Sequence, residues 1–120
     1  MMPHMLPVRE FRTAWLWDVG DVDTPKVLVP LSPEEYGLHA VIAVRVRDLR
    51  VPESNTAEGQ AVITTVAREL LQVWMPLQVT TYNRSFTRYQ GDIWLPQREA
   101  SYRAEVERIM QDLGIQPGGK

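Results

Sequence analysis

The sequence predicts an α+β fold, a two-layer sandwich in which two amphipathic helices cover one face of a mostly antiparallel sheet of about five strands. Two observations lead to this prediction. Segments with strand periodicity come in groups, in the order β-β-β-α-β-β-α, and such runs are typical of α+β proteins. Both helical segments also carry apolar stripes that would pack on a sheet.

The first strand is expected at residues 11–19, where successive side chains alternate between two faces. Phe11, Trp15 and Trp17 share one face, and aromatic residues in this arrangement belong more often to a core than to a ligand site. We therefore expect this face to be buried. If the face is exposed instead, it is an association surface.

Three further segments complete the first half of the predicted sheet. Turn-forming residues at 20–25 lead into a short strand at 26–30, which makes a hairpin with the first strand. A serine, a proline and two glutamates at 32–35 are typical of a helical turn. The longest strand is expected at 38–51, and Pro52 ends it because proline has no amide hydrogen for the ladder.

A long helix is expected at residues 56–74. Asn55, with Glu58 three residues later, has the spacing of a helix cap, and Pro76 prevents the helix from continuing. Apolar side chains at helical spacing form a wide stripe, made by Val62, Ile63, Val66, Ala67, Leu70, Leu71, Val73 and Trp74. A stripe of this width predicts deep packing against a sheet.

The second half of the chain repeats the pattern of strands followed by a helix. One strand is expected at 77–88 and a shorter one at 93–95, in which Trp94 is expected to anchor the core. The helix at 97–113 has the clearest helical periodicity, and Gly114 is its expected end cap. The two helices are expected to cover the sheet face that carries Ile42, Val44, Leu77 and Val79.

The composition is that of one globular domain of 120 residues, which we place at residues 11–114 between flexible ends at 1–10 and 115–120. The net charge of −2 argues against a protein that holds nucleic acid by bulk charge alone. The chain has no cysteine, which excludes disulfides and cysteine-ligated zinc. No segment is typical of a membrane span or a secretory signal, so we expect a cytoplasmic protein without a membrane partner.

The clearest candidate binding surface lies on the sheet face opposite to the helices. There, arginines are interleaved with aromatic residues in a set that we name the arginine–aromatic face: Arg45, Arg47, Tyr82, Arg84, Phe86 and Arg88. This pattern predicts a small non-catalytic binding module for a protein partner or a second copy of the chain, because tyrosine and arginine are enriched in protein interfaces. Single-stranded nucleic acid is the alternative partner, since rings stack bases while arginines contact phosphates. An ordinary exposed face, with arginine stems packed over rings, is a third interpretation.

Asp18, Asp21 and Asp23 form an acidic cluster that would suit a metal-dependent hydrolase, because Mg²⁺ and Ca²⁺ prefer oxygen ligands. A calcium loop requires a glutamate at its twelfth position, where this chain has Val29, and aspartate is also a common turn residue. The chain has two separate histidines and no nucleophile or phosphate-loop motif. We therefore expect no catalytic residue, no metal ligand and no cofactor.

Overall fold

The computed structural model of the protein describes residues 9–30, 38–72, 76–85 and 88–116. The elements follow in the order β1 (Arg9–Asp18), β2 (Lys26–Pro30), β3 (His39–Val46), α1 (Ala57–Val66), β4 (Leu77–Ser85), β5 (Arg88–Leu95), β6 (Ala100–Ser101) and α2 (Tyr102–Leu113). A π-helical turn, Ala67–Leu71, extends α1, and a 3-10 turn, Pro96–Arg98, precedes β6. The helical turn expected at 32–35 and most of the expected flexible ends lie outside the described residues.

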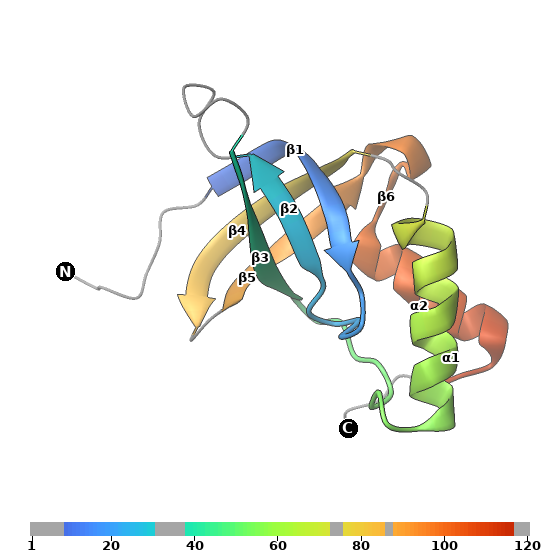
Figure 1. Cartoon of the computed structure of the whole chain (residues 1–120). Coiled ribbons are helices and arrows are strands. Elements are labelled where there is room, and N and C mark those ends of the chain that lie inside the picture. Colours follow the sequence, from blue (N-terminus) through green and yellow to red (C-terminus); the bar gives the residue numbers. More distant parts are fainter. Residues whose placement is uncertain (1–8, 31–37, 73–75, 86–87, 117–120) are drawn as a thin grey trace.

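Strands β1 to β5 close into a mixed β-barrel, so the predicted two-layer sandwich is wrong (Figure 1). The sheet runs in the order β3-β2-β1-β4-β5, with β6 beside β5. Closure comes from β3, whose residues 43–46 pair in parallel with residues 88–91 of β5. A long crossover that contains α1 and β4 connects these two strands, as parallel pairing requires.

The interior of the barrel is filled by the apolar face that strand alternation predicts. Val44, Leu77 and Val79 are fully buried, as expected. The element that covers them differs from the prediction, because a closed barrel buries its inner face against its own opposite wall. Val27 on β2 and Ile93 on β5 accordingly belong to the same core cluster.

Strand β1 places its tryptophans on the outside of the barrel. The ladder between β1 and β4 shifts register between Phe11 and Ala14, as a β-bulge does. After this bulge, Ala14 and Leu16 are buried, Trp15 is partly exposed and Trp17 is 53% exposed. The prediction that the tryptophan face of this strand is core is therefore wrong, and its alternative of an exposed face applies.

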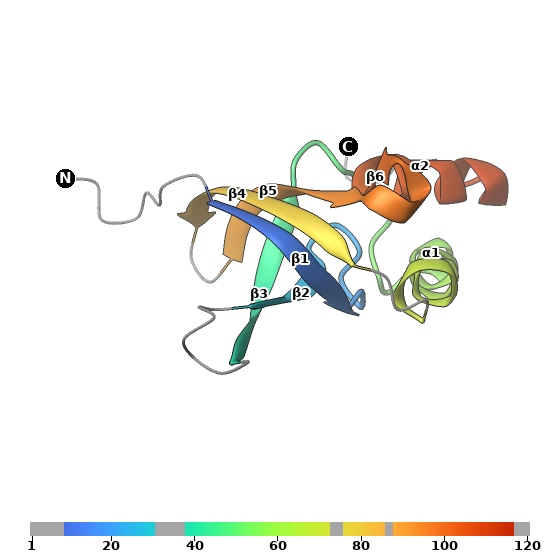
Figure 2. The same ribbon diagram turned by 90° about the horizontal axis from the view of Figure 1, so that it is seen from above.

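Both helices lie together at one side of the barrel (Figure 1 and Figure 2). Helix α1 is capped by Thr56, whose side-chain oxygen accepts a hydrogen bond from the amide of Gly59, so the cap lies one residue beyond the expected Asn55. The described part of the chain contains no helix whose length and apolar character would let it traverse a lipid bilayer.

Helix α2 begins at Tyr102, five residues later than the periodicity predicts. The residues just before it pair with β5 as strand β6, and Ser101 then caps the helix by accepting a hydrogen bond from the amide of Ala104. Gly114 ends the helix with a left-handed backbone conformation, which confirms the predicted cap.

Tyr102 ties α2 to the loop between β1 and β2. Its side chain is fully buried, and its hydroxyl donates a 2.8 Å hydrogen bond to the backbone carbonyl of Val22. Burial raises the pKa of Tyr102 well above its usual value, because a phenolate would be desolvated in this site. The raised pKa also makes the stability of the fold sensitive to alkaline pH.

We expect Tyr102→Phe to lower the free energy of unfolding by about 1–3 kcal/mol, because the Val22 carbonyl would lose its buried partner. The tyrosine remains protonated in the folded chain but ionises near pH 10 when the chain is unfolded. Its contribution to the free energy of unfolding is therefore complete below pH 10 and falls above pH 10 by about 1.4 kcal/mol per pH unit. Urea unfolding between neutral pH and pH 11 measures both effects. Equal alkaline slopes for Tyr102→Phe and the natural chain would contradict this prediction.

Candidate functional site

Residues from two strands and from the segment after β3 meet on the outer wall at the line where the barrel closes. They are Arg47, directly after β3, Tyr82 on β4 and Asp92 on β5, and we name them the seam cluster. The Oδ2 atom of Asp92 accepts hydrogen bonds from Arg47 at 2.8 Å and from the Tyr82 hydroxyl at 3.0 Å. The Arg47 guanidinium lies over the Tyr82 ring, 4.1 Å from the ring centre. The hydrogen bond to Asp92 is the main reason why the pKa of Arg47 and that of Tyr82 are both raised.

The seam cluster contains two residues of the predicted arginine–aromatic face, and it shows how they are used. Arg47 covers one side of the Tyr82 ring, so that side is closed to a stacking base. The charge of Arg47 is balanced by Asp92 in an exposed ion pair. This local geometry matches the third interpretation, in which arginine stems and rings cover an ordinary sheet face.

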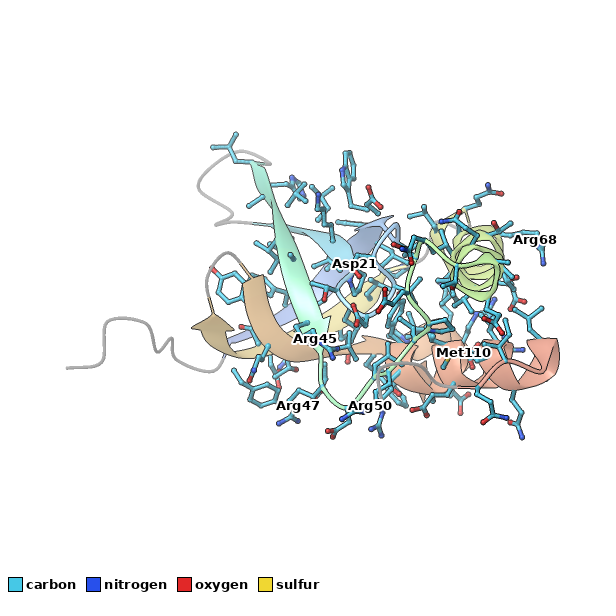
Figure 3. All side chains as sticks on the ribbon, turned by 90° about the horizontal axis from the view of Figure 1, so that it is seen from below. Asp21, Arg45, Arg47, Arg50, Arg68 and Met110 are labelled. Carbon is cyan, nitrogen blue, oxygen red and sulfur yellow. The ribbon has the colours of Figure 1, made fainter. Side chains whose placement is uncertain are left out.

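Arg45 contacts backbone rather than an open surface. Its Nη1 atom donates hydrogen bonds to the carbonyl oxygens of Val46 at 2.7 Å, Leu49 at 3.2 Å and Asp23 at 3.3 Å. These contacts join the carboxyl end of β3, where Figure 3 labels Arg45 and Arg47, to the loop between β1 and β2. Arg45 is therefore placed to support the fold, although the sequence predicts it as a binding residue.

Backbone register locates two of the remaining residues of the arginine–aromatic face. Arg84 on β4 pairs with Tyr89, and Arg88, the first residue of β5, pairs with Ser85 and also with Ala43 of β3. Both backbone positions are therefore close to the line of barrel closure. Phe86 lies outside the described residues.

A groove of about 450 Å³ crosses the outer wall beside the seam cluster. It contains two cross-strand rows of residues, Glu10–Thr80–Asp92 over β1, β4 and β5, and Gln78–Trp94–Ser101 over β4, β5 and β6. Three arginines also line it: Arg12 on β1, Arg47 after β3 and Arg103 on α2. The groove thus assembles side chains from six elements of the chain.

Trp94 and two of the arginines are the residues of this groove that sequence reasoning missed. Trp94 is 43% exposed, so the prediction that it anchors the core is wrong. The signal in the sequence was that Trp94 stands between the aliphatic residues Ile93 and Leu95, which face the opposite side of the strand and are both buried. Arg103 lies 3.8 Å from Asp48 in an exposed pair, and Arg12 makes no ion pair within the described residues.

Positive charge is concentrated on the barrel. Strands β1 to β5 contain five arginines and one lysine but only three carboxylates, a net charge of +3 in a chain whose total is −2. The excess acidic residues therefore lie in the helices, loops and remaining segments. The strands of the barrel are therefore more positively charged than the net charge of the chain indicates, which favours an anionic ligand.

Two of the three aspartates of the acidic cluster accept hydrogen bonds from neighbouring residues. Asp18 accepts a 2.6 Å hydrogen bond from the amide of Gly20, and Asp23 accepts one from the Thr24 hydroxyl. Asp21 and Asp23 line a second pocket, of about 530 Å³, beside the start of α1. Within the described residues, no three histidine or acidic side chains converge on a position where they would hold a metal ion. The geometry gives the hydrolase alternative no support.

Comparison with known proteins finds no matching family, no similar curated protein and no similar solved structure. A function for this chain must therefore be argued from its own surfaces.

Proposed function

We propose that the groove across the outer wall of the barrel binds single-stranded nucleic acid. The observation that carries the proposal is the exposed ring of Trp94 in a groove that Arg12 and Arg103 also line. Single-strand binding proteins combine rings on which bases stack with cations that contact the phosphates. Gln78 and Ser101 are the cross-strand neighbours of Trp94, and their polar side chains are suited to hydrogen bonds with base edges.

The topology of the barrel supports this proposal by analogy. Strands β1 to β3 form a meander, a helix leads to β4, and β5 closes the barrel against β3. Five-stranded Greek-key barrels include the oligonucleotide- and oligosaccharide-binding fold, which binds such ligands on the face of its strands 2 and 3 and on adjoining loops. The groove of this chain lies over β1, β4 and β5 instead, so the analogy concerns the class of ligand and not the place of the site. Because one fold hosts many functions, the groove and not the topology is the basis of the proposal.

The charges of the groove indicate that stacking contributes more to affinity than ionic contacts do. Three carboxylates, Glu10, Asp48 and Asp92, lie among the three arginines. If Arg12 and Arg103 each contact one phosphate, the logarithm of the binding constant should fall with the logarithm of salt concentration with a slope of about −1.4. A protein that binds mainly by bulk charge would give a much steeper slope.

We expect Trp94→Ala to weaken oligonucleotide binding by about 5- to 150-fold, since each stacked base contributes about 1–3 kcal/mol. Fluorescence anisotropy of labelled oligo-dT and oligo-U, titrated with the full chain at low and at higher salt, measures this loss. Trp17→Ala is the matched control, because it removes an exposed indole from a strand position that does not line the groove. We expect it to bind like the natural chain.

Two results would contradict the proposal. One is an unchanged anisotropy with both oligonucleotides at low salt and high protein concentration, which would leave a protein partner as the better prediction for this wall. The other is an equal loss of binding in Trp94→Ala and Trp17→Ala, which would place the nucleic acid elsewhere on the barrel.

A further inference from the structure

The two rows of side chains in the groove differ in charge. One row has a carboxylate at each end, and we name it the acidic row: Glu10, Thr80 and Asp92. The other contains no ionisable carboxyl or amino group, and we name it the neutral row: Gln78, Trp94 and Ser101. The rows are two residues apart along β4 and β5, or about 7 Å at about 3.4 Å per residue. A base stacked on the indole of Trp94 would therefore place one edge near the acidic row.

The neutral row does not distinguish one base from another. The amide of Gln78 and the hydroxyl of Ser101 each contain both a donor and an acceptor, so they pair equally with an amino group or a carbonyl oxygen. Stacking on an indole ring also tolerates any base. A preference among bases has to come from groups that only donate or only accept hydrogen bonds.

The groove contains groups of both kinds, and their positions give them different tasks. Arg12 on β1 and Arg103 just after β6 only donate, and they flank the neutral row on its two sides, where a strand crossing the row would place its phosphates. The carboxylates of the acidic row only accept. They would repel phosphates, so the part of a nucleic acid that suits them is a base edge with hydrogens to donate.

Asp92 is the acceptor that the structure holds in place. Its Oδ2 atom accepts hydrogen bonds from Arg47 at 2.8 Å and from the Tyr82 hydroxyl at 3.0 Å. Both bonds go to one oxygen, while a carboxylate has about four acceptor positions on its two oxygens, so capacity remains for a ligand. The side chain is 45% exposed, which leaves it accessible from the groove. An acceptor that is already fixed loses little conformational freedom when it binds.

A carboxylate selects bases by the groups on their edges. Cytosine, adenine and guanine carry an exocyclic amino group that can donate to it, and the N4 amino group of cytosine is a usual partner of aspartate and glutamate in nucleic-acid recognition. Thymine and uracil carry a carbonyl oxygen in place of the cytosine amino group, and two acceptors repel each other.

We infer that Asp92 makes the groove selective for bases with an exocyclic amino group, so that cytosine binds more tightly than thymine or uracil. The base stacks on Trp94 and its amino group donates a hydrogen bond to the Asp92 carboxylate. This inference rests on the proposed function, because it assigns a base preference to the same groove.

The test compares oligo-dC with oligo-dU, whose bases have the same ring and differ in the amino group that matters here. Fluorescence anisotropy with the natural chain, near neutral pH and at one salt concentration, should show about 5- to 30-fold tighter binding of oligo-dC. Asp92→Asn should bring the ratio of the two affinities close to one, because an amide both donates and accepts. Asp18→Asn is the matched control, since it removes the same charge from a residue of β1 that does not line the groove. It should change both affinities alike and keep the ratio.

The outcomes separate this inference from the proposed function. Equal binding of oligo-dC and oligo-dU, with both weakened in Trp94→Ala, would overturn the base preference and leave the groove as a nucleic-acid site. No binding of either oligonucleotide would overturn both. A preference for oligo-dC that a folded Asp92→Asn retains, or that Asp18→Asn loses, would refute the role of Asp92.

A change in the ligand tests the same hydrogen bond without altering the protein. An oligonucleotide of 2-pyrimidinone, which is cytosine with hydrogen in place of the amino group, should bind the natural chain about as weakly as oligo-dU does. Binding as tight as that of oligo-dC would contradict the inference. This measurement decides the question if circular dichroism shows that Asp92→Asn does not fold.

Discussion

Replacing Gly59 with alanine is expected to lower the free energy of unfolding by about 3 kcal/mol, the upper part of the range for overpacked sites. Gly59 is buried in the first turn of α1, where a methyl group would collide with the backbone carbonyl of Glu53 and crowd the backbone of Ser54. Both obstacles are main chain, so relief requires the helix or the preceding loop to move. Alanine favours helices by about 1 kcal/mol over glycine, so a net loss would come from this collision alone.

Urea unfolding of Gly59→Ala beside Gly20→Ala measures the effect. Gly20 is exposed, and a methyl group there would contact only the side-chain oxygen of Asp18, at 3.1 Å. We expect the control to change the stability by about 0.5 kcal/mol or less. Similar losses in both variants would show that α1 does not need its close approach to the 53–54 backbone.

Arg45→Met is expected to lower the free energy of unfolding by about 2–3 kcal/mol, because hydrogen bonds from a charged donor contribute about 1.5–3 kcal/mol each and the site is partly open to water. The substitution keeps an apolar stem but leaves the carbonyls of Val46, Leu49 and Asp23 without this donor. Arg45→Lys should recover only part of the loss, since an ammonium group lacks the planar fork of a guanidinium.

Arg47→Met is the matched control for Arg45, because it removes an arginine two positions along the same segment. Arg47 makes an exposed ion pair and a ring contact rather than bonds to several carbonyls. We expect a much smaller change in stability, measured by the same urea unfolding. An equal loss in the two variants would contradict the supporting role that we assign to Arg45.

Local sequence signals predicted the elements of the fold well. The left-handed cap at Gly114, the inward face with Val44 and Val79, and the break before β4 all depend on neighbouring residues or on simple periodicity. The cap of α1 lies at Thr56 rather than Asn55, an error of one residue. Such features are predictable because the interactions that create them span only a few residues.

The candidate groove was much less predictable. Among the predicted binding residues whose side chains are described, only Arg47 lines it. Trp94, Arg12 and Arg103 also line it and come from segments that carry no binding motif. Alternation indicates which residues share a face of one strand, but it does not state whether that face lies inside or outside. Trp94 faces outward because its neighbours Ile93 and Leu95 are buried in a core that distant strands help to build.

The sequence by itself determined the number and type of the main elements, because periodicity and capping are local. Only the tertiary structure decided that the sheet closes, since the pairing of residues 43–46 with 88–91 joins strands that are far apart in the chain. It also decided the outward position of Trp17, because one bulge in β1 reverses which side its later residues face. Strand pairing and bulges are set by long-range backbone hydrogen bonds and shared burial, which no single segment encodes.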